Sequence, residues 1–202
     1  VFSEKPLAGS AEAARAIAAQ AQNADLTLQT GYFFRTIPAL NRARDWIAVG
    51  RLGRISAARM MFCHDGGYAD WLDLDCWMTD PALARYDGFV DEAVHVMRFR
   101  SGAVGVVEAG WTDTRMRLEL DLVGDDGAIS LRDGTLTLTQ RGADVPDETL
   151  TLDPLDAGTG ILPFLDALEG RDAPALVPPR EAASVNDILD AMGLRLATQD
   201  TN

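Results

Sequence analysis

The sequence has few of the features that mark specialised classes of protein. Two cysteines, Cys63 and Cys76, are too few for the disulfide framework of a small secreted domain. The first residues lack the charged and apolar layout of a signal peptide. No apolar run approaches the roughly 18 to 20 residues that span a bilayer. We therefore expect a reduced, cytoplasmic compartment and no membrane partner.

Positive charge is also scarce. The chain has 18 Lys and Arg residues against 31 Asp and Glu, which gives a formal net charge of -13. Nucleic acids and anionic membranes bind surfaces of clustered Lys and Arg, so the sequence predicts neither as a partner. The rest of the composition is ordinary. With 202 residues, 47% hydrophobic and 24% charged, the chain is long enough for a packed core in one or two domains.

The first 35 residues have the order of a parallel strand-helix-strand unit. Val1 and Phe2 fit the end of a strand, Ser10 fits the N-cap of an alanine-rich helix over residues 11–22, and a short strand is expected over Leu26–Thr30. A parallel pair at the start of a chain needs further strands beside it. We therefore predict that residues 1–35 are the C-terminal remnant of a dinucleotide-binding domain.

Residues 36–202 are expected to form a second domain of α+β class. Thr36 and Pro38 fit the start of a helix that Gly50 closes. Strict alternation then predicts an antiparallel, open-faced sheet with one apolar face. The expected strands lie at residues 54–64, 104–111, 116–122, 129–131, 136–138 and 149–152. Helices over 161–168 and about 180–198 are expected to cover the apolar face, and the threonine-rich opposite face fits a partner sheet.

The stretch from Tyr86 to His95, YDGFVDEAVH, holds one of the two histidines four residues after Asp91. If the segment from Val90 is helical, the two side chains share a face, and the carboxylate prepares the imidazole as a general acid or base. The alternative is a helix in which Asp91 serves the first-turn dipole and His95 is a satisfied, half-buried residue. Spacing leaves both interpretations open.

Several motifs occur in an order that resembles the glucose-fructose oxidoreductase and inositol dehydrogenase family. The resemblance covers nearly the whole chain. It is carried by Glu4-Lys5-Pro6 after a strand, the segment from Gly31 to Arg35, Gly50-Arg51-Leu52-Gly53 before a strand, Asp91 with His95, and FRSGAVGVVEAGW from Phe99 to Trp111. It implies a Rossmann domain followed by an open-faced sheet that builds a homo-oligomer, with NAD or NADP as cofactor and a sugar or polyol as substrate.

The resemblance also implies roles for individual residues. Lys5 matches the lysine between nicotinamide and substrate, and Glu4, Lys5 and Pro6 together match the cofactor-binding motif. Asp91 and His95 match the catalytic pair, with His95 as base. The candidate substrate contacts are Arg35, His64 and Trp71, although His64 fits a surface histidine as well, and Trp71 fits a residue that seals its loop.

Two departures from the family pattern bear on activity. No GxGxxG turn is present to hold a pyrophosphate, so we expect the isolated chain to bind NAD poorly. The family helix around the catalytic histidine is long, whereas here Phe99-Arg100-Ser101-Gly102, the start of the next family strand motif, follows His95 within four residues.

The sequence therefore supports two functions. The first is an NAD(P)-dependent sugar or polyol oxidoreductase in shortened form. The second is a non-catalytic oligomerisation or sugar-binding module derived from that family. No metal site is predicted, because Cys63, His64, Cys76 and His95 lack the paired spacing of zinc ligands.

Overall fold

The computed structural model describes residues 1–66, 92–151 and 160–192, which divide between two compact units. Of the described chain, the first unit contains residues 1–36 and 160–192, and the second contains residues 37–66 and 92–151. The first unit ends at Thr36 and the second begins at Ile37, one residue after the domain boundary expected from the sequence. Residues 160–192, which the sequence assigned to the second domain, belong with the first unit.

The first unit opens with the expected strand-helix-strand order. Strands β1 (Phe2–Ser3) and β2 (Gln29–Thr30) pair in parallel, and α1 (Ala11–Asn23) connects them. The hydroxyl of Ser10 accepts a hydrogen bond from the backbone N–H of Ala13 at 3.2 Å, which confirms Ser10 as the N-cap. A short 3-10 helix, η1 (Phe33–Thr36), follows β2.

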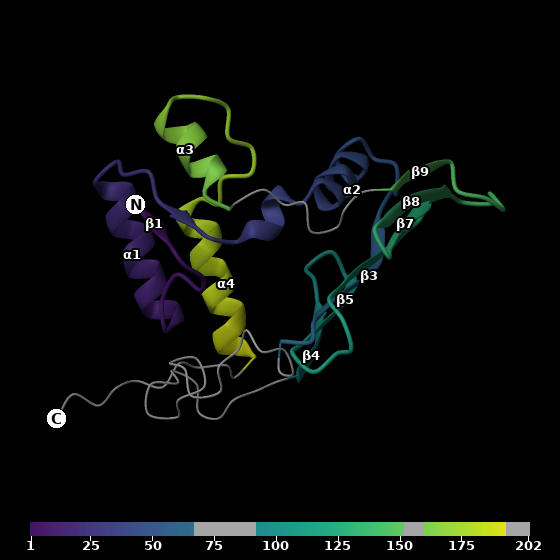
Figure 1. The fold of residues 1–202 in the computed structure, drawn as a ribbon, viewed down its shortest axis with the longest axis horizontal. Coiled ribbons are helices and arrows are strands. Elements are labelled where there is room, and N and C mark those ends of the chain that lie inside the picture. The colour runs from purple at the N-terminus through teal and green to yellow at the C-terminus, as the bar shows by residue number, and fades with distance from the viewer. Residues whose placement is uncertain (67–91, 152–159, 193–202) are drawn as a thin grey trace. The chain divides into compact units, whose positions relative to one another are not determined.

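Two later helices, α3 (Leu162–Leu168) and α4 (Pro179–Ala191), complete the first unit. Figure 1 shows α4 beside α1. Small side chains let the two helix backbones approach closely and leave a compact apolar core. Its buried members are Leu7, Ala14, Ala18, Ala21, Leu28, Val177, Ala182 and Ala183. Helix α4 thus packs its alanine face against α1.

One buried polar side chain connects three segments of this unit. Gln29 is 1% exposed. Its side-chain oxygen accepts the N–H of Val177 at 2.8 Å, and its amide nitrogen donates to the carbonyl of Gly160 at 3.4 Å. A buried amide satisfied in this way fixes direction as well as distance, so β2 holds the segments that lead into α3 and α4.

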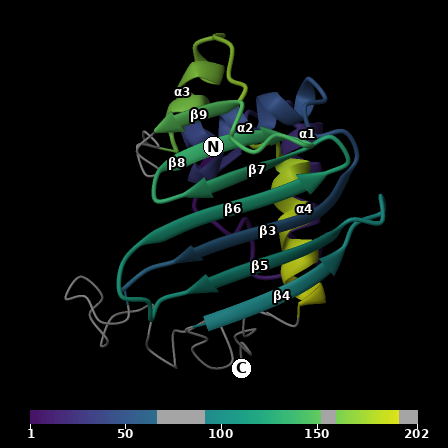
Figure 2. The ribbon, with the colours of Figure 1, turned by 90° about the vertical axis from the view of Figure 1, so that its right-hand side faces the viewer.

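The second unit is the predicted open-faced sheet (Figure 2). Its strands occur in the order β4-β5-β3-β6-β7-β8-β9, and all pairs are antiparallel except β3 with β5. The bounds are β3 (Ile55–Cys63), β4 (Glu92–Arg98), β5 (Val104–Gly110), β6 (Arg117–Gly124), β7 (Gly127–Arg132), β8 (Thr135–Gln140) and β9 (Glu148–Thr151). The α+β class is confirmed. The parallel pair was not predicted from the sequence.

Turn residues set the hairpins of the sheet. Between β7 and β8, Asp133 and Gly134 both have positive φ, at 46° and 75°. That pair of conformations belongs to the tight hairpin turn that Asp-Gly favours. The turn joins β7 to β8 in the register in which Leu131 lies opposite Leu136.

The two faces of the sheet differ in polarity. One face carries the leucine and isoleucine side chains of β6, β7 and β8, of which the most buried are Ile129, Leu131, Leu136 and Leu138. Helix α2 (Pro38–Ala48) is tied to the same face, because Trp46 donates a 3.2 Å hydrogen bond to Glu148, and Glu148 lies opposite Leu138 in the ladder. Thr36 does not cap α2; its hydroxyl donates to the carbonyl of Phe33 instead.

The other face carries paired charges. Arg59 lies 3.3 Å from Glu108, and Arg132 bridges Glu119 and Asp121. Threonines continue the polar surface over β8 and β9. None of the helices in residues 1–66, 92–151 and 160–192 is long and apolar enough to cross a membrane.

Candidate active site

Lys5 lies where the parallel strands of the first unit end. It follows β1 by two residues and is exposed, as is Glu4. Glu4 folds against the end of β2, since a Cβ added to Gly31 would lie 3.4 Å from its carboxylate and 3.3 Å from the ring of Phe2. Ligands of open parallel sheets bind beyond the carboxyl ends of the strands. The structure therefore brings an amine and a carboxylate to the edge where such a ligand is held.

The composition of the chain distinguishes Lys5 in a second way, in addition to the Glu4-Lys5-Pro6 motif. Of the 18 Lys and Arg residues, 17 are arginine, and Lys5 is the single lysine. Wherever this chain has a surface cation, it uses a guanidinium. An ammonium differs because it is a compact point charge that transfers a proton far more readily than a guanidinium does. Lys5 is therefore the one side-chain amine of the sequence.

The helix after Lys5 is not open to a pyrophosphate. In the first turn of α1, the N–H of Ala11 donates to the carboxylate of Asp190 at 3.1 Å, and the N–H of Ala13 donates to Ser10. Two amides of that turn are thus already used, and Asp190 places negative charge beside them. In the described part of the chain, the first turn of α1 therefore does not fit a pyrophosphate.

His95 lies in a strand, and the prediction of a helix around it is wrong. It occupies the middle of β4, opposite Val107 of β5, and is partly exposed. Residues 92–98 alternate between more and less exposed positions, and that two-residue period outweighs the four-residue spacing read as helical. Asp91 is outside the described residues. The argument that pairs Asp91 with His95 on one helix face therefore fails, although their chemical roles stay a prediction.

The second histidine, His64, has an aromatic neighbour and a hydrogen bond to its ring. His64 follows the end of β3, and Trp111 follows the end of β5; because these strands are parallel, both residues lie at one edge of the sheet. Their rings lie 5.2 Å apart. The Nδ1 atom of His64 accepts the N–H of Gly66 at 3.0 Å, so the neutral ring carries its proton on Nε2. The site pairs an aromatic face with a directed donor, and Trp111 was not predicted as a candidate.

Charged residues border that histidine. The backbone N–H of Asp113 donates to the carbonyl of His64 at 3.1 Å. A hydrogen bond from the Arg117 guanidinium lowers the pKa of the Asp113 carboxyl, with a further contribution from the N–H of Thr114. Burial, with the charge of Glu108, raises the pKa of the Cys63 thiol. Asp113 is therefore held ionised, whereas Cys63 stays a neutral thiol.

The remaining candidates are placed as follows. Arg35 lies in η1 and forms an ion pair with Glu181 in the first turn of α4. Pro6 is partly buried behind Lys5. Trp71 is outside the described residues. Within the described ranges, no three His, Cys, Asp or Glu side chains are grouped so that they hold a metal ion.

The chain is similar to sugar-related reductases and dehydrogenases. No family model matches it. It is 27% identical over 215 aligned residues to a 1,5-anhydro-D-fructose reductase of Ensifer adhaerens, with 87% of this chain covered. The chain spans 64% of the length of that reductase.

Solved structures share the fold over nearly the whole chain. An oxidoreductase domain protein from Kribbella flavida matches with a TM-score of 0.73 and 22% identity, over 96% of this chain and 70% of that protein. A levoglucosan dehydrogenase in complex with NADH and levoglucosan matches with a TM-score of 0.70 and 19% identity, over 94% of this chain and 70% of its own. At these identities the solved structures establish the fold.

Proposed function

Because this chain is related to the glucose-fructose oxidoreductase and inositol dehydrogenase family, we propose that it serves NAD(P)-dependent hydride transfer at a hydroxyl carbon of a sugar or polyol. One observation carries the proposal: the single lysine of the chain lies beyond the ends of a parallel strand pair, beside Glu4. A levoglucosan dehydrogenase with this fold is solved with NADH, which supports a nicotinamide cofactor.

Lys5 is proposed as the catalytic amine. Oxidation of an alcohol breaks its O–H and C–H bonds; the hydride leaves to the nicotinamide and the proton to a base. The ammonium of Lys5 donates a hydrogen bond to the alcohol oxygen and stabilises the negative charge that develops as the proton leaves. In the reductive direction, the same hydrogen bond polarises the carbonyl.

The base is proposed to be a histidine, and the chain has two. The family resemblance assigns the role to His95, with Asp91 orienting it, and that assignment is retained as the first candidate. His64 and Arg35 are proposed as substrate contacts together with Trp71. The pairing of His64 with Trp111 supports the contact at position 64, because a sugar ring presents C–H bonds to an aromatic face and hydroxyls to a donor.

The test combines cofactor binding with four substitutions. NADH fluorescence is titrated against the 202-residue chain, and turnover is measured with sugar and polyol substrates. Where turnover is found, Lys5→Met is expected to lower kcat by at least about 100-fold, and Lys5→Arg to fail to restore it. His95→Gln and His64→Gln form a matched pair, and the base is the position whose loss removes about 100-fold or more in kcat. A Lys5→Met variant with undiminished kcat overturns the assignment.

We also propose a second function, a sugar-binding or oligomerisation module without turnover. The N–H groups of Ala11 and Ala13 donate to Asp190 and Ser10, so the first turn of α1 does not offer them to a cofactor phosphate. The charged face of the sheet is the proposed homo-oligomer surface, and the most exposed valines on its strands are Val94 at 62% and Val96 at 72%. Absence of NADH binding at millimolar concentration, with a dimer in sedimentation that Val96→Glu dissociates, favours this alternative.

A further inference from the structure

Lys5 lies between two anchors of different origin. On its N-terminal side, β1 pairs with β2 through Ser3 and Thr30. On its C-terminal side, the next residues are held by α4. The side chain of Leu7 is buried in the core between α1 and α4, and the carbonyl of Ala8 accepts a 2.7 Å hydrogen bond from the side-chain amide of Asn186.

Asp190, one helical turn after Asn186, makes a second contact between α4 and the segment that follows Lys5. It lies four residues after Asn186, so both side chains project from one face of α4. Its carboxylate accepts the N–H of Ala11, the first residue of α1. Two side chains of α4 therefore hold the backbone at both ends of the short segment from Ala8 to Ala11, three residues after the amine.

The surroundings of Asn186 do not explain it as a stabilising residue. Asn186 is 3% exposed, and its neighbours on α4 at the interface are Ala182 and Ala183. Its side-chain oxygen has no hydrogen-bond partner among the described residues. An unsatisfied buried polar atom destabilises a fold by about 1 to 3 kcal/mol. An apolar side chain would be favoured here by stability alone, so the directional bond to Ala8 is the property that distinguishes asparagine.

We propose that Asn186 and Asp190 are positioning residues for Lys5: the C-terminal helix α4, and not the strand pair alone, sets where the amine lies. This inference rests on the proposed function of Lys5 as the catalytic amine. Two residues more than 180 positions away in the chain would then control where the Lys5 amine lies.

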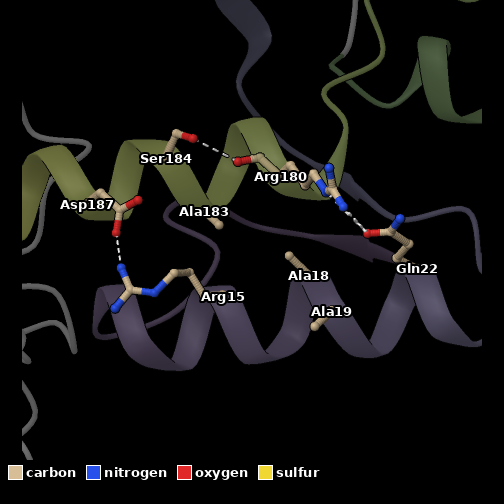
Figure 3. Close-up of a pocket in the computed structure, with 8 residues that line it drawn as sticks. All are labelled: Arg15, Ala18, Ala19, Gln22, Arg180, Ala183, Ser184 and Asp187. Atoms are coloured by element: carbon tan, nitrogen blue, oxygen red, sulfur yellow. Dashed lines mark hydrogen bonds and ion pairs between the residues drawn. The ribbon is translucent and has the colours of Figure 1, made fainter.

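The chain offers a matched control on the same helix. Asp187 forms an ion pair with Arg15 of α1, and Arg180 donates to the side chain of Gln22 (Figure 3). These contacts also join α4 to α1, but they lie beyond the segment from Lys5 to Ala11. If α4 only holds α1 in place, loss of the Asp187 contact and loss of the Asn186 contact should act on Lys5 alike.

The single lysine makes the position of the amine measurable without turnover. Reductive methylation with 13C-formaldehyde labels two kinds of amine, Lys5 and the N-terminal amine of Val1, which donates to the carbonyl of Thr27 and serves as an internal reference. The 13C-methyl signals are compared among the unsubstituted chain, Asn186→Leu, Asp190→Leu, Asp190→Asn and Asp187→Asn. Circular dichroism verifies that each variant is folded.

We expect the Lys5 signal to move in Asn186→Leu and Asp190→Leu, and to stay in place in Asp187→Asn and in Asp190→Asn, which keeps an acceptor for Ala11. The Val1 signal stays unchanged in all four. Where turnover is measurable, the two leucine variants lower kcat by about tenfold to 100-fold with KM within about twofold, as expected for misplacement of a reacting group.

The outcomes separate the two proposals. A Lys5 signal that stays in place in both leucine variants overturns the positioning role, whatever the activity. If Asn186→Leu does not fold, the Asp190→Leu and Asp190→Asn pair gives the answer. A Lys5 signal that moves equally in Asp187→Asn also overturns the positioning role, because any contact that holds α4 against α1 would then have the same effect on Lys5. Undiminished turnover in Lys5→Met overturns the proposed function separately.

Discussion

The two units differ in the sequence separation of the contacts that stabilise them. In the sheet, most paired strands are neighbours in the chain, and the Asp133-Gly134 turn joins β7 to β8. In the first unit, the decisive contacts join the two ends of the sequence: Asn186 to Ala8 across 178 residues and Val177 to Gln29 across 148. The comparison teaches that the surroundings of Lys5 depend on contacts between residues far apart in the sequence, whereas the sheet depends mainly on contacts between neighbouring strands.

Removal of α4 is the strongest way to separate the two units. A chain that ends at Pro178 loses Ala182 and Ala183, which share a buried core with Ala14 and Ala18. We expect α1 and β2 to lose amide protection in hydrogen exchange, while β3 and β6 to β8 keep theirs. Loss of protection in the sheet to the same degree would show that the units fold as one.

A substitution that creates a cavity in the apolar core of the sheet tests whether the second unit can be destabilised without the first. Leu131 is fully buried, and Leu131→Ala is expected to destabilise the second unit by about 2 to 5 kcal/mol. Urea unfolding followed by the exchange of β7 and β8 amides measures the change. The signals of α1 serve as the control, and they are expected to keep the midpoint of the unsubstituted chain.

A smaller effect is expected at the polar connector of the first unit. Gln29→Ala leaves the N–H of Val177 without its acceptor in a buried position, which costs about 1 to 3 kcal/mol. The loss should appear in the exchange of α1 and α4 amides. Thr27→Ala, in the partly exposed residue two positions earlier, is the matched control and is expected to change little.

The smallest effect is a pH dependence confined to the second unit. Burial raises the pKa of the Glu148 carboxyl, but hydrogen bonds from Arg51, Arg42 and Trp46 outweigh it and leave the pKa below its ordinary value. A depressed pKa contributes stability above the unfolded pKa that is lost as the pH falls through the folded one. Glu148→Gln should therefore lower the midpoint of the sheet at neutral pH and have no effect once acid protonates Glu148. A difference that persists in acid would contradict this.

The sequence predicted the elements that local rules determine. Ser10, the alternating leucines of β6 and the Asp133-Gly134 turn each act over a few residues, and the structure contains all three. The partner of α4 was not predictable, because its alanines fit any closely packed surface and only the three-dimensional fold selects α1. His95 was misread for a related reason: one carboxylate four residues away outweighed the two-residue alternation of β4.

The site was partly predictable. Lys5 was found from its motif, and its uniqueness among 17 arginines was available in the composition. Trp111 was missed because its link to His64 arises from the parallel pairing of β3 and β5, which no local pattern encodes. Asn186 was missed because its partner is a backbone carbonyl, and backbone groups leave no trace in a sequence.

The closure of the first unit by α4 has a consequence for the order of folding. During synthesis, the strands and turns of the sheet are complete before residue 179 leaves the ribosome, whereas β1 and α1 must wait for their partner helix. The segment that carries the amine is thus made before its partner helix and is fixed only when that helix has been made. A nascent chain should protect its hairpins well before the environment of Lys5 becomes ordered.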